Sequence, residues 1–330
     1  MNKFLIIIIF SFIFCNKELD SLIFKHFQKF IKKYNKKYNS INEYLTRYEV
    51  FKINVMEAFS NESKSYKTGI TKFSDLTKEE FAKTYLNLNY NPITMDKLEQ
   101  TLVKSSNEAP TEFDWREYGV VSVKDQDYCN SGWAFAAIGN LEALYAIKKG
   151  NLELFSEQML VDCDTSDSGC NGGLMEYAFT WLKNNGGIMY EADYPYRGTK
   201  STCKSDASKY IDMKITGYNR ISSWTQLTDE EVMKEFLYEN GPLAVLINAT
   251  PLQTYTSGIL DVGTYKCPLE GVNHAVLLVG YGVDSKYGTN YWIVRNSWGK
   301  TWGEKGYFRI RRGNSTCGIN YYVITATVSF

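Results

Sequence analysis

The sequence predicts an α+β protein with two lobes, a cleft between them, and a helical segment ahead of both. Helical periodicity dominates the chain up to about residue 240, and strand-like runs follow one another from there to the end. A polar stretch of low pattern, residues 91–107, separates an N-terminal helical part from the rest. Helices followed by strands are typical of α+β folds. The 330 residues suffice for two cores, or for one core plus a processed segment.

The composition is that of an ordinary globular protein. Hydrophobic residues make up 44% and charged residues 22% of the chain, so a sizeable core can be buried. Lys+Arg and Asp+Glu are equal at 37 each. This balance gives no electrostatic reason to expect nucleic acid or an anionic membrane as a partner.

The N-terminus predicts a secretory signal peptide over residues 1–15. Lys3 precedes an apolar run from Phe4 to Phe14, which is too short to span a bilayer comfortably. An uncleaved anchor is the alternative. The signal peptide would direct the protein into the secretory pathway, to the lysosome or vacuole or to the extracellular space. After its removal the protein would have no membrane attachment. Asn61, Asn248 and Asn314 lie in N-x-S/T sequons, as in secreted glycoproteins.

Local signals place the helices in order. An aromatic stripe at three- and four-residue steps predicts one long helix from Leu22 to Asn61. A central helix begins near Gly132 and ends at Lys148-Lys149-Gly150. Ser156 caps a short helix that reaches Cys163, and another helix runs from Leu174 to Asn185. A capping box from Thr228 to Glu231 starts the last helix, which stops at Gly241-Pro242. The expected strands are 243–248, 274–279, 291–295, 307–311 and 322–326.

Cysteine usage indicates an oxidising compartment. The chain has 7 cysteines, and loss of Cys15 with the signal peptide leaves an even number. Spacing alone leaves every connectivity of the remaining cysteines open. Zinc is a poor alternative because no C-x2-C pair occurs and the histidines are only His26 and His274. We therefore expect neither a metal nor a cofactor.

The stretch from Gln126 to Phe135 reads Gln-Asp-Tyr-Cys-Asn-Ser-Gly-Trp-Ala-Phe. It resembles the nucleophile segment of the papain family of cysteine peptidases, usually Gln-Gly-x-Cys-Gly-Ser-Cys-Trp-Ala-Phe. The position of the nucleophilic cysteine is Gly132. The segment from Val272 to Gly282 is similar to the family's histidine strand, and Asn296-Ser-Trp298-Gly to its asparagine turn. The resemblance implies that His274 is the general base, that Asn296 orients it, and that Gln126 supplies an oxyanion-hole amide.

The N-terminal part resembles the prosegments of cathepsin L-like members of this family. Glu43, Arg47, Phe51 and Asn54 follow the ERFNIN signature, with Glu43 and Arg47 spaced to pair at i,i+4. Residues 69–81 are similar to the Gly-x-Asn-x-Phe-x-Asp element, with Thr71 in place of Asn. The resemblance implies three regions: a signal peptide (1–15), a helical inhibitory prosegment (16–108) and a papain-like peptidase domain (109–330). The peptidase domain would have a helical lobe and a β-barrel-like lobe with the cleft between them.

The same resemblance assigns substrate-binding and structural residues. Gly172 and Gly173 would let a peptide backbone lie against the cleft, although a tight turn explains them equally well. Trp298 would shield the catalytic pair from water. The main specificity pocket would be shallow and apolar, lined by Leu174, Met175, Ala275 and Tyr322. The implied disulfides are Cys129–Cys170, Cys163–Cys203 and Cys267–Cys317, which leaves no free thiol in the mature chain.

Three functional hypotheses remain from the sequence. Glycine at position 132 has no atom that could attack a carbonyl, so the first is an inactive homologue that binds a peptide or protein in the cleft. Its own prosegment would be one partner, and the protein would be a monomer. The second is an active endopeptidase that bypasses Gly132, for instance through Ser131, although one helix residue turns a side chain by about 100° away from His274. The third is a structural or storage glycoprotein.

Overall fold

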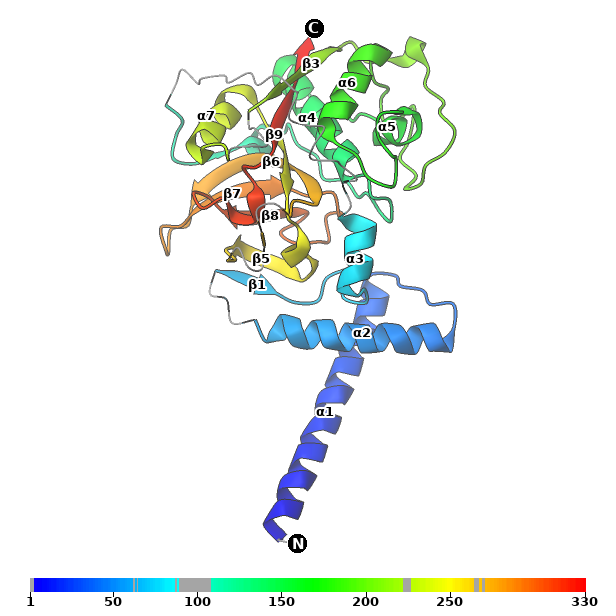
Figure 1. Ribbon diagram of the computed structural model, residues 1–330, viewed down its shortest axis with the longest axis vertical. Helices are drawn as coiled ribbons and strands as arrows, with labels where there is room; N and C mark the ends of the chain where they lie inside the picture. The colour runs from blue at the N-terminus through cyan, green and yellow to red at the C-terminus, as the bar shows by residue number, and fades with distance from the viewer. Residues whose placement is uncertain are drawn as a thin grey trace.

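The computed structural model describes residues 3–61, 63, 65–86, 88, 108–221, 227–263, 267–268 and 271–330, with side chains from residue 18 onward. The α+β prediction is confirmed: helices precede most of the strands (Figure 1). The helices are α1 (Lys3–Lys33), α2 (Ile41–Phe59), α3 (Lys78–Tyr85), α4 (Gly132–Lys149), α5 (Glu157–Cys163), α6 (Met175–Asn185) and α7 (Glu230–Asn240). The strands are β1 (Tyr66–Thr68), β2 (Phe113–Asp114), β3 (Lys214–Arg220), β4 (Leu243–Ile247), β5 (Tyr255–Leu260), β6 (His274–Val283), β7 (Asn290–Arg295), β8 (Tyr307–Arg311) and β9 (Val323–Ser329). The expected linker over residues 91–107 lies outside the described residues.

The strands form one open sheet. Its order is β1-β5-β8-β7-β6-β4-β9-β3, with β2 paired to β6. The lobe that the resemblance implies to be β-barrel-like is built on this sheet, which is open, with β1 and β3 at opposite edges. The edge strand β1 belongs to the N-terminal segment, residues 3–88, and pairs antiparallel with β5 of the main domain. The strands predicted from the sequence did not include β3 or β5.

Two hydrophobic cores flank the central elements. One gathers α4, α5 and α6 with residues of β3, β4 and β9. The other lies on the sheet and includes α7 and aromatic residues of the N-terminal segment. Helix α4 is buried along most of its length, from Gly132 to Ala146, as expected for a helix that is apolar on nearly every side. It packs against β6, β4 and β9 and so joins the helical lobe to the sheet.

The long helix predicted from Leu22 to Asn61 is wrong. The structure has two helices, α1 and α2, that cross each other (Figure 1). The chain turns between them, where Asn35 adopts a φ of 49° and the Ser40 hydroxyl accepts a hydrogen bond from the amide of Glu43. The helices pack through the Phe27, Phe30 and Phe51 rings of the aromatic stripe. The apolar periodicity of the sequence continues from α1 into α2 because each helix buries an apolar face.

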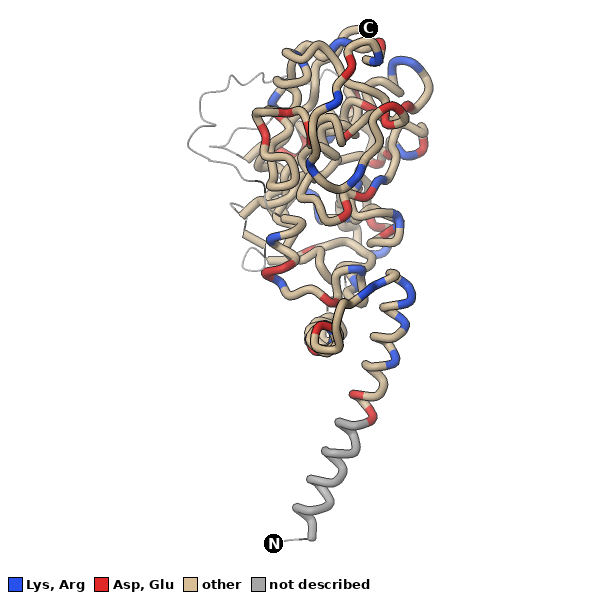
Figure 2. The backbone as a smooth tube through the Cα atoms, turned by 90° about the vertical axis from the view of Figure 1, so that its right-hand side faces the viewer, with Lys and Arg blue, Asp and Glu red and all other residues tan. Residues whose placement is uncertain are grey.

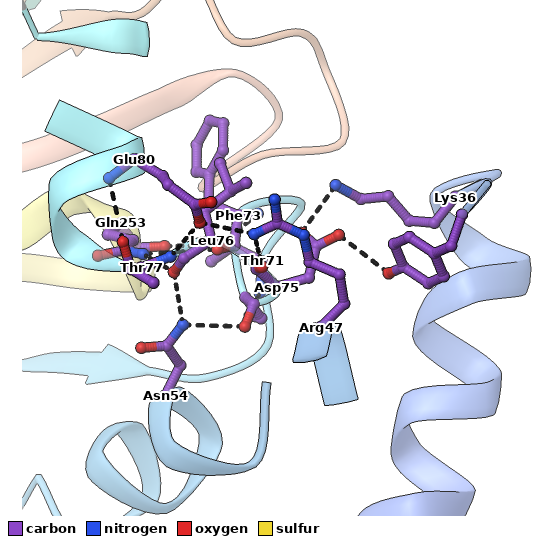
Figure 3. Close-up of polar contacts among 12 residues, drawn as sticks. Lys36, Arg47, Asn54, Thr71, Phe73, Asp75, Leu76, Thr77, Glu80 and Gln253 are labelled. Carbon is purple, nitrogen blue, oxygen red and sulfur yellow. Dashed lines mark hydrogen bonds and ion pairs between the residues drawn. The ribbon is translucent and has the colours of Figure 1, made fainter. Parts of the chain in front are cut away.

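The expected pair between Glu43 and Arg47 does not form. Glu43 lies in the first turn of α2, and its Oε2 accepts from the amide of Asn39 at 2.6 Å. Arg47 reaches away from α2 and donates to Glu80 Oε2 of α3 at 2.6 Å and to the carbonyl of Asp75 at 3.0 Å (Figure 3). A tertiary ion pair has replaced the local one, because α3 brings a carboxylate to the guanidinium.

The loop before α3 holds the N-terminal segment against the main domain. Asn54 of α2 donates to the carbonyls of Ser74 (2.9 Å) and Leu76 (2.8 Å), using both amide hydrogens (Figure 3). Thr71 donates to the carbonyl of Gln253 at 2.6 Å, and the Gln253 amide donates back to Leu76 at 2.9 Å. The residues of both N-terminal motifs thus form one hydrogen-bonded junction with the Thr250–Gln253 turn.

Other local predictions have mixed outcomes. Ser156 caps α5 as expected, accepting from the amide of Met159. The cap of α7 is Asp229 rather than Thr228, whose hydroxyl donates to the carbonyl of Ile221 instead. The three implied disulfides are all present: Cys129–Cys170, Cys163–Cys203 and Cys267–Cys317.

The charge distribution follows the composition. Acidic and basic residues are interspersed over the main domain, while lysines line the part of α1 that leads into the turn (Figure 2). Within the described part of the chain, no helix is long and apolar enough to cross a membrane.

Replacing Asn54 with Ala should loosen the N-terminal segment. The change removes two hydrogen bonds and leaves the buried carbonyl of Ser74 without its donor, at a cost of about 1–3 kcal/mol, while the carbonyl of Leu76 keeps its bond from Gln253. We expect faster amide hydrogen exchange in α3 and β1 than in the unmodified protein. Asn42→Ala is the matched control, because Asn42 is exposed on the same helix. Equal exchange in the two variants would contradict the assigned role of Asn54.

The three sequons differ in accessibility. Asn248 is only 4% exposed, and its side-chain amide donates to the carbonyl of Pro268 while its Oδ1 accepts from the amide of Thr250. Asn314 is exposed. A folded chain therefore has no room for a glycan on Asn248. Glycopeptide mass spectrometry of protein from a eukaryotic secretory host should find Asn314 occupied and Asn248 bare. A glycan on Asn248 in folded protein would contradict this packing.

Candidate active site

Gly132 opens α4 directly opposite His274, the first residue of β6. A Cβ built on Gly132 would lie 2.7 Å from Cε1 and 2.9 Å from Nδ1 of His274. Contacts below 3.0 Å are not tolerated, so a larger residue would require the imidazole to withdraw. The lobes place the helix N-terminus, which carries partial positive charge, and the imidazole face to face. The side chain that would join them is absent from this position.

His274 is fixed on its other side. Its Nε2 donates to Oδ1 of Asn296 at 2.9 Å, because that oxygen also accepts from the amide of Ser297 and so must be the acceptor. The Trp298 ring stacks on the imidazole at 4.9 Å between centroids. With the proton on Nε2, the Nδ1 lone pair points toward Gly132. The predicted orienting role of Asn296 and the shielding role of Trp298 fit this geometry.

Burial lowers the pKa of His274 to about 4, and the bond to Asn296 offsets this only in part. A carboxylate or thiolate beside the ring would favour the imidazolium, and Gly132 supplies neither. The ring is therefore neutral over the physiological range.

Gln126 is fully buried beside this pair. Its Nε2 donates to the carbonyl of Cys129 at 2.9 Å, and its Oε1 accepts from the Ser297 hydroxyl at 2.7 Å. A side-chain amide has two N–H donors, so one remains for an oxyanion after the bond to Cys129. Its position is compatible with the role that the family resemblance implies.

Ser131, the alternative nucleophile, is engaged elsewhere. Its hydroxyl lies 2.7 Å from the Tyr196 hydroxyl and 3.4 Å from the Cys129 carbonyl. Tyr196 in turn donates to the carbonyl of Gln126. The prediction that Ser131 points away from His274 is confirmed.

The glycine turn is tightly packed. Gly172 has a φ of 103°, and a Cβ on Gly173 would lie 2.5 Å from Oδ1 of Asp167. The same oxygen accepts from the amide of Leu174 at 2.9 Å. Burial, and then the neighbouring Asp164 carboxylate, raise the pKa of Asp167 to about 9. The backbone conformation of Gly172 and the close packing of Gly173 therefore explain both glycines as parts of a tight turn. Peptide binding by them stays a prediction.

The four residues predicted for the specificity pocket come together in one buried cluster. Leu174, Met175, Ala275 and Tyr322 all belong to the core of the helical lobe. Leu88 of the N-terminal segment joins the same cluster and is only 5% exposed. Sequence reasoning missed Leu88, because nothing in a polar stretch singles out one leucine. It also missed Glu176 and Arg220. The Tyr322 hydroxyl donates to the Glu176 carboxylate, and the Arg220 guanidinium lies over the Tyr322 ring. Among the described residues, no group of His, Cys, Asp and Glu could hold a metal ion.

A helix N-terminus facing an imidazole, with an amide that orients the ring and a second amide nearby, is the active-site frame of a thiol hydrolase. The comparisons agree with this frame. Residues 109–327 match the model of "Papain family cysteine protease", and residues 27–81 match "Cathepsin propeptide inhibitor domain (I29)". The chain belongs to the papain family of cysteine proteases.

Individual relatives cover almost the whole chain. Cysteine proteinase 15A of Pisum sativum is 40% identical, over 92% of this chain and 86% of that protein. Cathepsin F of Drosophila melanogaster is 38% identical, over 94% of this chain and 51% of that protein. Among solved structures, digestive procathepsin L 3 of Tenebrio molitor larval midgut superposes with a TM-score of 0.83 at 34% identity, covering 93% of this chain and 99% of that one. The fold and the presence of a propeptide domain follow from these matches.

The neutral state of His274 can be observed directly. The chain has 2 histidines, so a His26→Gln variant leaves a single imidazole for NMR titration. We expect its midpoint at about 4. Since an unfolded histidine titrates near about 6.5, the free energy of unfolding should fall as pH drops from there toward 4. A midpoint at or above the unfolded value would show that the ring is not desolvated as described.

Proposed function

We propose that this chain is a papain-family homologue that does not cleave peptides and uses its cleft to bind an extended peptide or protein segment. The observation that carries this proposal is Gly132 at the start of α4. Papain-type chemistry needs a thiolate at this place to attack the scissile carbonyl. Glycine offers no nucleophilic atom. In subtilisin, a protease of a different fold, removal of the nucleophile lowers kcat by about 10⁶-fold. A loss of that size would leave no useful peptidase.

The close approach of the His274 imidazole to Gly132 supports the proposal that the chain does not cleave peptides. His274 lies within 3 Å of the position that any Cβ on residue 132 would occupy, so the ring and the glycine are fitted to each other. The six cysteines of the main domain are all used in disulfides, and Ser131 is bonded to Tyr196. The described residues therefore supply no second nucleophile beside His274.

The N-terminal segment would be the first occupant of the cleft. It contacts the main domain through strand β1, through the hydrogen bonds of Thr71 and Leu76 with Gln253, and through the buried Leu88. Without a thiol, the chain would not release this segment by itself. We propose the boundaries given above: signal peptide 1–15, prosegment 16–108 and papain-like domain 109–330. The disulfides and the N-terminal apolar run support a route through the secretory pathway to the lysosome, the vacuole or the extracellular space.

An active endopeptidase is the second candidate. It is favoured by Gln126, His274 and Asn296, which stand together as peptide hydrolysis would require, and by relatives that carry the name cysteine proteinase. This function would require a nucleophile that the described residues do not supply.

Three proteins distinguish these candidates: the unmodified chain, Gly132→Cys and Gly132→Ala. Each is freed of its N-terminal segment by an added protease, which is then inhibited, and is assayed with fluorogenic peptides and an epoxide thiol probe. We expect activity and labelling only in Gly132→Cys, after the imidazole has shifted. Both variants should lose about 1–3 kcal/mol of stability, because each adds a Cβ against His274.

Gly132→Ala is the matched control, since it has the Cβ but no thiol. Cleavage by the unmodified chain, or self-cleavage of the full-length protein near Ala109 at acid pH, would overturn the proposal in favour of the active endopeptidase. Silence of Gly132→Cys, together with no peptide binding by the unmodified domain, would favour a structural or storage role.

A further inference from the structure

A polar groove lies where the N-terminal segment meets the main domain. Its volume is about 530 Å³, within the roughly 300–1,000 Å³ range of small-molecule pockets. The N-terminal segment lines it with residues of α2 and β1, and the main domain lines it with the Thr250–Gln253 turn. Hydroxyl and amide side chains from both parts of the chain face it: Ser60, Asn61, Thr68, Thr250, Gln253 and Thr254. We call it the junction groove.

The charges that line the junction groove are paired with each other. Lys78 Nζ lies 2.7 Å from Oε1 of Glu57, and these are the two charged residues of its lining. Both side chains are exposed, so water screens them as well. Apolar surface comes from Ala58, Tyr66 and Pro251. An occupant suited to this lining is neutral, rich in hydroxyl or amide groups and apolar on one face, as a sugar of the N-acetylhexosamine class is.

Asn61 lines the same groove and can carry such a sugar. It lies two residues beyond the end of α2, in the sequon Asn61-Glu-Ser63, and it is partly exposed. Its Nδ2 donates to Oγ1 of Thr68 at 3.1 Å, and its Oδ1 accepts from the amide of Ser63 at 3.3 Å. A side-chain amide has two N–H groups, so one remains for a glycosidic bond.

Glycosylation of Asn61 would use a lipid-linked oligosaccharide diphosphate, the donor of the eukaryotic secretory pathway. A bond forms between Nδ2 and C1 of the first N-acetylglucosamine, and the bond from that carbon to the diphosphate breaks. The displaced Nδ2 proton passes to the released diphosphate. The sugar chain would then begin at the junction groove rather than in open solvent.

We propose that Asn61 carries an N-linked glycan whose first sugars fill the junction groove and hold the N-terminal segment on the main domain. The glycan is attached to the N-terminal segment, while Thr250, Pro251 and Thr254 belong to the main domain. Contacts between them would add to the pairing of β1 with β5. Because the sugar is already tethered at the groove, its binding is intramolecular and needs no external concentration. Such a clamp would act whether or not the cleft binds a peptide.

The alternative is a glycan that extends into solvent, and enzymatic release distinguishes the two. The full-length chain is secreted from cells that leave N-glycans in the oligomannose form and is treated with endoglycosidase H, native and denatured. Mass spectrometry follows release at Asn61, with the exposed Asn314 as the control. Release from Asn61 should be about tenfold or more slower in native protein, because the enzyme reaches the core sugars only when the groove opens. An unoccupied Asn61, equal rates in native and denatured protein, or an equal slowing at Asn314 would overturn the proposal.

Amide hydrogen exchange in β1 tests the clamp itself. Ser63→Ala destroys the sequon and keeps Asn61, whereas Ser63→Thr keeps both. When the two variants are made in the secretory host, the β1 amides of Ser63→Ala should exchange about fivefold or more faster. When they are made in bacteria, which add no such glycan, they should exchange alike.

Two results of this comparison would contradict the clamp. The first is equal exchange of the two variants made in the secretory host. The second is a difference that persists in the bacterial proteins. It would assign the effect to the Ser63 hydroxyl, which lies 3.2 Å from that of Ser65, and not to the glycan.

Discussion

The stacking of Trp298 on His274 is the contact on which the rest of the cleft depends. The same indole packs edge to face against Trp302 of the main domain and Phe73 of the N-terminal segment. One side chain therefore packs on the imidazole, shields it from water and contacts the N-terminal segment. Because Trp298 is fully buried, its position is set by all three partners at once. A movement of the N-terminal segment would therefore shift Trp298 and, through it, the imidazole of His274.

Electrostatics explain why the imidazole of His274 is neutral. A papain-type pair is stabilised as thiolate and imidazolium, each of which favours the charged form of the other. With Gly132 at this position, burial lowers the pKa of His274 and only the hydrogen bond to Asn296 opposes it, so the ring is neutral. The Nδ1 lone pair remains directed at the helix N-terminus without a proton to remove. The surrounding amides of Gln126 and Asn296 are hydrogen-bonded, so the groups around Gly132 form an ordered frame.

Prediction from sequence worked best where a signal is local or where the family motif is long. Gly150 ends α4 and Ser156 caps α5 as expected, and the motifs pointed to His274 and Asn296, whose side chains are hydrogen-bonded to each other. It failed where a local pattern had a distant competitor. Arg47 left Glu43 for Glu80, and the periodicity that suggested one helix from Leu22 to Asn61 hid the turn before α2. Strand β5 was missed because its partners, β1 and β8, come from remote parts of the chain.

The sequence by itself determined the α+β class, the family and the glycine at position 132, since each depends on residue identity along the chain. Only the tertiary structure decided how the remaining groups meet. Three features join residues that are far apart in sequence: the approach of His274 Nδ1 to within 2.9 Å of a Cβ built on Gly132, the burial of Leu88 in the core of the helical lobe, and the pairing of Glu176 with Arg220. Local propensity acts over one or two helical turns, whereas these contacts are selected by the packing of whole elements against one another.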